Sequence, residues 1–164
     1  VSEMKGEPQP EAKSEIKLDV PTDAFLPTDY VEKEELRLEA YRRLAGVTSQ
    51  AEVDDIELEW EDRYGPLPGP AVSLLQVGSL RAQCHRLGIN DIQISGSAST
   101  GGTAKLAPLE LKLSETMRLR RISKGAKYKE DLGQLVVPLP RGADASTFLA
   151  TFLHDLIPAD SDSV

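Results

Sequence analysis

The sequence predicts one α+β domain with an extended N-terminal arm and three helices, then a small, mostly antiparallel sheet and a C-terminal helix. Three observations support this fold class. Apolar residues recur at three- and four-residue steps in the first half and near the end, which is typical of helices. Between these regions the apolar residues alternate, which favours strands. No internal repeat is present, so a solenoid is not expected.

The 164 residues are enough for a single domain with a real core. Residues 1–15 mix Glu, Lys, Pro and Gln with little to bury, so we expect a flexible linker. Residues 16–158 form the predicted domain, and the tail 159–164 is expected to be disordered.

The first half of the domain holds the arm and the three helices. Pro21 and Pro27 favour extended geometry in the arm, 16–30, which we expect to lie across the core. The helices are expected over 31–45, from an N-cap at Ser49 to residue 64, and from a first turn at Pro70 to a C-terminal glycine cap at residue 88. The third helix is apolar on most sides, which indicates a central element, with Gly78 allowing a close neighbour.

The second half should hold the strands. Strands are expected near 89–94, over the alternating leucines 109–113 after Pro108, and over 135–139, where Pro138 and Pro140 should end the last one. Residues 117–122 are ambiguous between helix and strand. A final helix is expected over 144–157, with Asp144 as its N-cap.

Composition and charge exclude several classes of protein. No apolar run approaches the roughly 20 residues that span a membrane, so no membrane partner is expected. The single cysteine, Cys84, excludes an internal disulfide framework and fits a reducing compartment. Residues 1–67 carry a net charge of −10 and residues 68–141 a net charge of +6. An acidic first half argues against direct DNA binding and favours a basic protein surface as partner.

No catalytic site, metal site or cofactor site is expected. The glycine-rich segment 96–103 resembles a phosphate-binding loop, but Gly102 stands where the required lysine would be, so we expect a flexible hairpin loop. Cys84 and His85 are neighbours on a helix and diverge by about 100°, which is unsuited to a catalytic pair. His154 is isolated, and no CxxC or HExxH motif is present. We therefore expect a non-enzymatic chain.

Two charged surfaces are candidate binding sites. On the second helix, Asp55, Glu59 and Asp62 lie at about 200°, 240° and 180° from Val53, opposite the apolar stripe, and could pair with arginines of a partner. An ordinary solvated face is the competing interpretation. A basic run is the alternative site, a contact for nucleic acid or RNA polymerase. Its members are Arg118, Arg120, Arg121, Lys124, Lys127 and Lys129. Only Tyr128 could add base stacking there, so a solvated face is favoured.

The segments LDVPTDAFLPTDYVEKEELRLEAYRRLA and EDRYGPLPGPAVSLLQVGSLRAQCHRLGI carry a family resemblance. The chain resembles the C-terminal domain of bacterial transcription-repair coupling factors from about residue 16 to 94, and more weakly beyond. The resemblance implies a domain without motor motifs, cut from an ATP-driven, helicase-like DNA translocase. Such factors remove stalled RNA polymerase from damaged DNA and recruit UvrA to nucleotide-excision repair, which implies a cytoplasmic bacterial protein.

The resemblance also implies a role for this domain. In the family it folds back on a UvrB-like module of the same factor and masks the UvrA-binding surface, so the free factor is autoinhibited. The covering contact uses an acidic pair in the pattern E-x-x-D-R-[YF]-G, matched here by Glu59 and Asp62. Glu61 departs from the family, which commonly has an apolar residue there, and adds charge near the interface.

Overall fold

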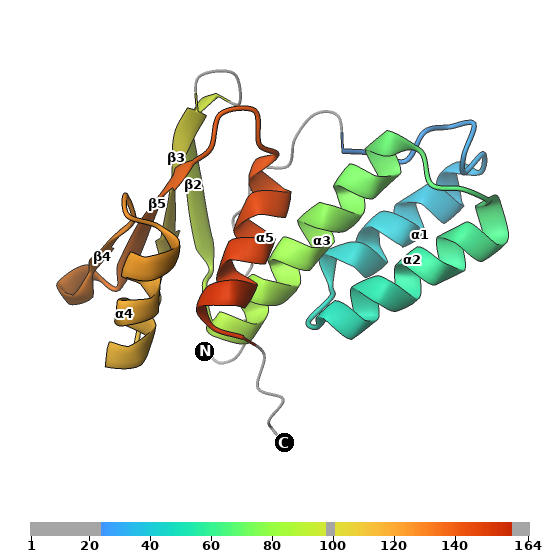
Figure 1. Ribbon diagram of the computed structural model, residues 1–164. Coiled ribbons are helices and arrows are strands. Elements are labelled where there is room, and N and C mark those ends of the chain that lie inside the picture. Colours follow the sequence, from blue (N-terminus) through green and yellow to red (C-terminus); the bar gives the residue numbers. More distant parts are fainter. Residues whose placement is uncertain (1–23, 98–100, 159–164) are drawn as a thin grey trace, which may run out of the picture.

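The computed structural model describes residues 24–97 and 101–158 (Figure 1). Within these ranges the helices are α1 Glu34–Ala45, α2 Gln50–Tyr64, α3 Gly69–Leu87, α4 Leu113–Ile122 and α5 Ala145–Leu156. A short 3-10 helix, η1, spans Glu130–Leu132. The expected linker 1–15, the start of the arm and the tail 159–164 lie outside the described residues.

The strands form one antiparallel sheet, which confirms the predicted α+β class. They are β2 Asp91–Ser97, β3 Gly101–Ala107, β4 Lys127–Lys129 and β5 Gln134–Leu139. Their order is β2-β3-β5-β4, and every neighbouring pair is antiparallel. Because side chains alternate between the faces of a strand, residues at every second position point to the same side. On β3 these are Ala104 and Leu106, both fully buried.

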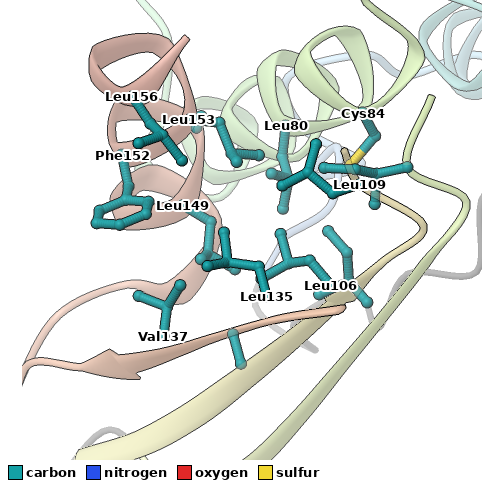
Figure 2. Close-up of a cluster of buried hydrophobic side chains, with 14 of the residues drawn as sticks. Leu80, Cys84, Leu106, Leu109, Leu135, Val137, Leu149, Phe152, Leu153 and Leu156 are labelled. Carbon is teal, nitrogen blue, oxygen red and sulfur yellow. The ribbon is translucent and has the colours of Figure 1, made fainter. Parts of the chain in front are cut away.

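Buried side chains gather in two clusters. One lies between the arm and helices α1, α2 and α3, around residues such as Ile56, Trp60 and Leu75. The other lies between the sheet and the helices α3, α4 and α5, and Figure 2 shows Leu80, Leu106, Leu135, Leu149 and Leu153 in it. Helix α3 contributes to both clusters. It is therefore the central element that its all-round apolar sequence predicts.

Several helix ends form as predicted. The Ser49 Oγ accepts the Glu52 backbone N–H at 3.2 Å, and an Asp144 carboxylate oxygen accepts that of Thr147 at 2.9 Å. Gly88 ends α3 in the left-handed conformation, at φ 79°. Gly78 lies against Leu44, and a Cβ on it would stand 2.7 Å from the Leu44 Cδ1. The Ser49, Asp144 and Gly88 signals act through contacts local to the helix ends, which explains why sequence alone revealed them, whereas the contact of Gly78 with Leu44 is tertiary.

The described end of the arm packs onto the helices. Ala24 and Leu26 are buried, the Phe25 N–H donates to the Pro70 carbonyl at 3.2 Å, and the Leu26 N–H donates to the Tyr41 hydroxyl at 2.7 Å. This confirms that the arm lies across the core at residues 24–27, whereas residues 28–30 form a turn and not the expected extended chain. Helix α1, however, begins at Glu34 and not at residue 31. The reason is a turn before it, in which the Pro27 carbonyl accepts the backbone N–H of Val31 at 3.1 Å.

The strand expected over 109–113 is wrong. Only Leu109 of the three alternating leucines is buried, its N–H donates to the Gly133 carbonyl at 2.8 Å, and Leu113 begins α4 with 78% of its surface exposed. The strand of this region is β3, which starts within the expected loop. Residues 117–122, ambiguous in sequence, are helical in α4.

Pro138 was expected to end the last strand, but it lies inside β5, opposite Thr103. The register explains this. Strand β4 pairs with β5 only at residues 134–136, so at Pro138 the strand has a neighbour on one side.

Candidate functional site

The outer face of α2 is the principal candidate site. Helix α2 lies at the end of the molecule opposite the sheet (Figure 1). Its inner face is formed by Val53, Ile56 and Trp60, which are buried, and Ser49 fixes where the helix begins. Asp55 and Asp62 are exposed on the other side, as the helical spacing predicts. The two carboxylates therefore stand on a rigid helix and face solvent.

Glu59 is placed differently from the sequence prediction. Its carboxylate oxygens lie 2.8 Å from the Arg43 Nη1, on α1, and 3.4 Å from the Arg63 Nη1, one turn further along α2. The hydrogen bond from Arg43 is the main cause that lowers the Glu59 pKa. At about 240° on the helix Glu59 sits at the edge that faces α1, so of the three predicted carboxylates Asp55 and Asp62 point most directly outward.

Three further exposed side chains lie on this side of α2, Leu58 on the outward face and Asp54 and Glu61 at its other edge, and sequence reasoning missed them as a group. Asp54, Leu58 and Glu61 are exposed, and Leu58 keeps 64% of its surface accessible. A helical projection places Leu58 at about 140°, between Asp62 and Asp54, so the pattern was available in the sequence. Among the described residues Asp55, Glu61 and Asp62 form no ion pair. The face thus offers unpaired carboxylates around an exposed leucine.

The basic run is divided by the fold. The Arg118 Nη1 donates to the Leu156 carbonyl at 2.6 Å and joins α4 to the end of α5. The other five cations of the run are exposed: Arg120, Arg121, Lys124, Lys127 and Lys129. The Tyr128 hydroxyl donates to the Leu109 carbonyl at 3.0 Å and accepts the Leu111 N–H at 3.1 Å. Arg118 and Tyr128 therefore have structural roles, which leaves five exposed cations in the run and no free aromatic ring within it for base stacking.

The glycine-rich segment forms the predicted hairpin. Gly96 pairs with Gly102, and Ser97 with Gly101, across β2 and β3. A strand follows the segment where a phosphate-binding loop needs a helix N-terminus. The hairpin tip, 98–100, lies outside the described residues.

The other candidate reactive groups are separated. Cys84 is buried between α3 and the sheet, and desolvation raises its pKa to about 12, so it is a neutral thiol at pH 7. His85 is exposed on α3, and His154 is exposed on α5. Over residues 24–97 and 101–158, no group of His, Cys, Asp or Glu side chains could hold a metal ion. In the same ranges, no helix has the length and apolar character needed to cross a bilayer.

A cavity of about 650 Å³ lies between α2, α3 and α5. Its polar lining includes Glu57, Gln83, Arg86 and His154. The Oε1 of the buried Gln83 accepts the Arg86 Nε–H at 3.1 Å. The Arg86 guanidinium in the cavity wall therefore already has a hydrogen-bond partner. The lining also carries the hydroxyl groups of Thr48, Ser49, Ser79 and Thr151, and among the described residues no hydrogen bond joins any of them to His154.

Comparison with known proteins points to one family. The model of the TRCF domain matches residues 20–114. The transcription-repair-coupling factor of Mycobacterium bovis is 42% identical over 131 residues, which cover 80% of this chain and 10% of that protein. The factor of Escherichia coli is 36% identical over 81 residues, 49% of this chain and 7% of that protein. The chain thus spans about a tenth of the length of these relatives.

A solved structure gives the same result at the level of the fold. The crystal structure of the C-terminal domain of a transcription-repair coupling factor superposes with a TM-score of 0.68 at 17% identity. The match covers 92% of this chain and 95% of the other. Both the helical half and the sheet therefore belong to a shared architecture.

Proposed function

This chain belongs to the TRCF domain family, and we propose that it is a non-catalytic regulatory domain that masks the UvrA-binding surface of a transcription-repair coupling factor. It would do so by packing on the UvrB-like module of the same factor. The parent factor would be a cytoplasmic bacterial protein that acts on stalled RNA polymerase and recruits UvrA. The ATP-driven translocase activity of the parent would reside elsewhere in that longer protein.

The outward face of α2 supports this proposal. Asp55 and Asp62 are exposed, rigidly held and without an ion pair in the described part of the chain. Carboxylates in this state accept bidentate hydrogen bonds from arginines of a partner without first giving up a partner of their own. A UvrB-like surface that presents arginines would therefore find its complement here.

Glu59 would contribute less directly than Asp62. It already binds Arg43 and Arg63, so an incoming arginine would have to compete for its carboxylate oxygens. Exposed ion pairs are worth about 0 to 1 kcal/mol, so such an exchange costs little.

Masking within one polypeptide does not require a tight interface. A tether raises the effective concentration of the domain near the module to the order of millimolar, and a weak contact then stays mostly closed. Binding of another part of the factor to RNA polymerase would open it. The exposed, charged face suits such a reversible contact, because it remains hydrated when open.

The test is to reverse the charges of the outward face in the full-length factor. We expect Asp55→Arg with Asp62→Arg to increase UvrA affinity by about tenfold or more, since opposed arginines would repel each other. These positions are preferable to Glu59, because an arginine at 59 would lie against Arg43 and Arg63 and disturb the packing of α1 on α2.

The control for this experiment is Glu130→Arg with Asp131→Arg in η1, which changes the net charge equally on exposed residues remote from α2. UvrA affinity should be that of the wild type in this control. Equal UvrA affinity in the wild type and the α2 variant would reject the masking function.

A second candidate function uses the basic run as a contact for nucleic acid or RNA polymerase. Its five exposed cations, Arg120, Arg121, Lys124, Lys127 and Lys129, support it. Phosphate binding by these cations should weaken steeply as salt rises from 50 to 200 mM, at a slope that Arg120→Glu with Arg121→Glu would reduce. A gel shift with single-stranded and duplex DNA at low salt measures this, and the absence of any shift removes the nucleic-acid form of the hypothesis.

A further inference from the structure

We propose that Leu58 is the apolar centre of the α2 docking face, and that this face fits a protein surface with an apolar socket rimmed by arginines or lysines. The inference rests on the masking function proposed above and states the chemistry of the surface that α2 recognises. It also assigns a binding role to Leu58.

The position of Leu58 on the helix carries the argument. Residues three and four positions apart are neighbours on a helix surface. Asp54 and Asp55 precede Leu58 by four and three positions, and Glu61 and Asp62 follow it by three and four. All five side chains are exposed. A single leucine with 64% of its surface accessible thus stands at the centre of four carboxylates.

Folding does not account for a leucine at this position. Leu58 belongs to neither buried cluster, and the opposite side of α2 supplies the packing through Val53, Ile56 and Trp60. A polar residue at 58 would serve the helix equally well and would suit the acidic surface better. A partner that covers Leu58 would give it the apolar contact that the fold does not.

The surroundings of Leu58 match the physical organisation of a binding hot spot. Interface energy concentrates in a few central residues that lose their water, within a rim of polar contacts that keeps solvent out. Asp54, Asp55, Glu61 and Asp62 would form this rim, and their charge selects cations on the partner. Apolar contact at the centre would then add affinity that the exposed ion pairs alone supply only weakly.

The same arrangement selects the class of partner. Four carboxylates around one leucine repel the phosphates of nucleic acid and the anionic head groups of a membrane. A basic protein surface is the remaining complement.

The edge of the face also sets the orientation of the partner. Arg43 and Arg63 stand beside Glu59, and the Arg63 guanidinium lies 5.3 Å from the centre of the Tyr64 ring. These cations border the side of α2 that faces α1. Arginines of a partner would meet less repulsion at the carboxylates on the outward side than at that border, so Arg43 and Arg63 favour one direction of docking.

Calorimetry of the chain with the separately expressed UvrB-like module of the same factor tests the proposal. Leu58→Ala should weaken binding by about tenfold or more, as expected for a hot-spot side chain. The matched control is Leu132→Ala in η1, because Leu132 is exposed to a similar extent, 61%, and lies outside α2. This control should bind as the wild type does. Thermal unfolding should be nearly unchanged in both variants, since both side chains are exposed.

The outcomes separate this inference from the function on which it rests. No binding by the wild type at concentrations on the order of millimolar, which a tether would supply, would overturn both. Binding that Asp55→Arg with Asp62→Arg abolishes, but that Leu58→Ala leaves unchanged, would retain the acidic contact and overturn the role of Leu58. Repeating the titrations at 50 and 300 mM NaCl gives a second criterion. Salt should weaken binding by both the wild type and Leu58→Ala. The ratio of their affinities should stay nearly constant, because salt does not screen an apolar contact.

Discussion

Gly102 shows why a glycine-rich segment can be read in two ways from sequence. It faces Gly96 across the β2–β3 hairpin, and a Cβ on Gly102 would collide with the Ser95 carbonyl oxygen. The glycines are thus required by close backbone contact between strands. The same residues in sequence resemble a phosphate-binding loop, and only the missing lysine separates the two interpretations.

Gly102→Ala should therefore destabilise the domain by about 1 to 3 kcal/mol, because backbone atoms must move to accommodate the methyl group. Gly69→Ala is the control, since nothing lies within 4 Å of a Cβ at that position. Urea denaturation measures both. A Gly102→Ala protein as stable as the wild type would show that the strands do not approach this closely.

Glu59 provides a pH-dependent test at the same scale. Arg43 and Arg63 lower its pKa, so the ion pairs stabilise the fold above the unfolded-state pKa of about 4.3, and this contribution is lost as pH falls through the lower folded-state pKa. With 38% of the side chain exposed, screening limits the effect to about 0.5 kcal/mol. Glu59→Gln should be slightly less stable than the wild type at pH 7, and the difference should vanish in strong acid. Urea titrations at both pH values measure it, and a difference that grows in acid would contradict the assignment.

Helix caps account for the elements that sequence reasoning placed best. Helices α2, α3 and α5 carry Ser49, Pro70 and Asp144 near their first turns, and their predicted bounds agree with the structure to within one residue. Helix α4 has no comparable signal, because Leu119 is its single buried residue and no apolar stripe forms. Strand β3 was not predicted, because it begins with two glycines, which favour a loop when only the local sequence is considered.

Ser49→Ala should destabilise the domain by about 1 kcal/mol through loss of the α2 cap. The Glu52 carboxylate, which accepts the Thr48 N–H at 2.6 Å, would hold part of the turn in place. Ser73→Ala in the interior of α3 is the control and should be neutral or mildly stabilising, since alanine is the better helix former. Thermal unfolding distinguishes the two, and equal melting temperatures would show that the cap is dispensable.

At the scale of the whole molecule, the two buried clusters share α3. We therefore expect them to unfold together, as one cooperative domain. The sequence supplies one probe for each cluster. Trp60, the one tryptophan, lies in the helical cluster, and Cys84, the one cysteine, lies in the cluster under the sheet. Fluorescence of Trp60 and thiol reactivity of Cys84 therefore report on different halves.

We expect both probes to give the same midpoint in urea, because neither cluster can lose α3 and remain packed. In the native state Cys84 should react very slowly with a thiol reagent at pH 8, since burial raises its pKa to about 12. Two separate midpoints would instead divide residues 16–158 into two units and contradict the single predicted domain.

The candidate site was predictable to the extent that it depends on one helix. Helical geometry alone placed Asp55 and Asp62 on the outward face of α2. It could not place Glu59, because Arg43 belongs to α1 and the packing of α1 on α2 is a tertiary contact. Leu58 required knowledge of which apolar residues remain uncovered, and this depends on the whole fold.

The separation of acidic α2 from the exposed cations of α4 and β4, at opposite ends of the molecule in Figure 1, makes the domain an electric dipole. A dipole near a polyanion such as DNA experiences a torque that turns its positive end inward. The acidic face of α2 would then point away from the polyanion. It would stay open to basic protein surfaces while the cationic end of the domain faces the negative charge.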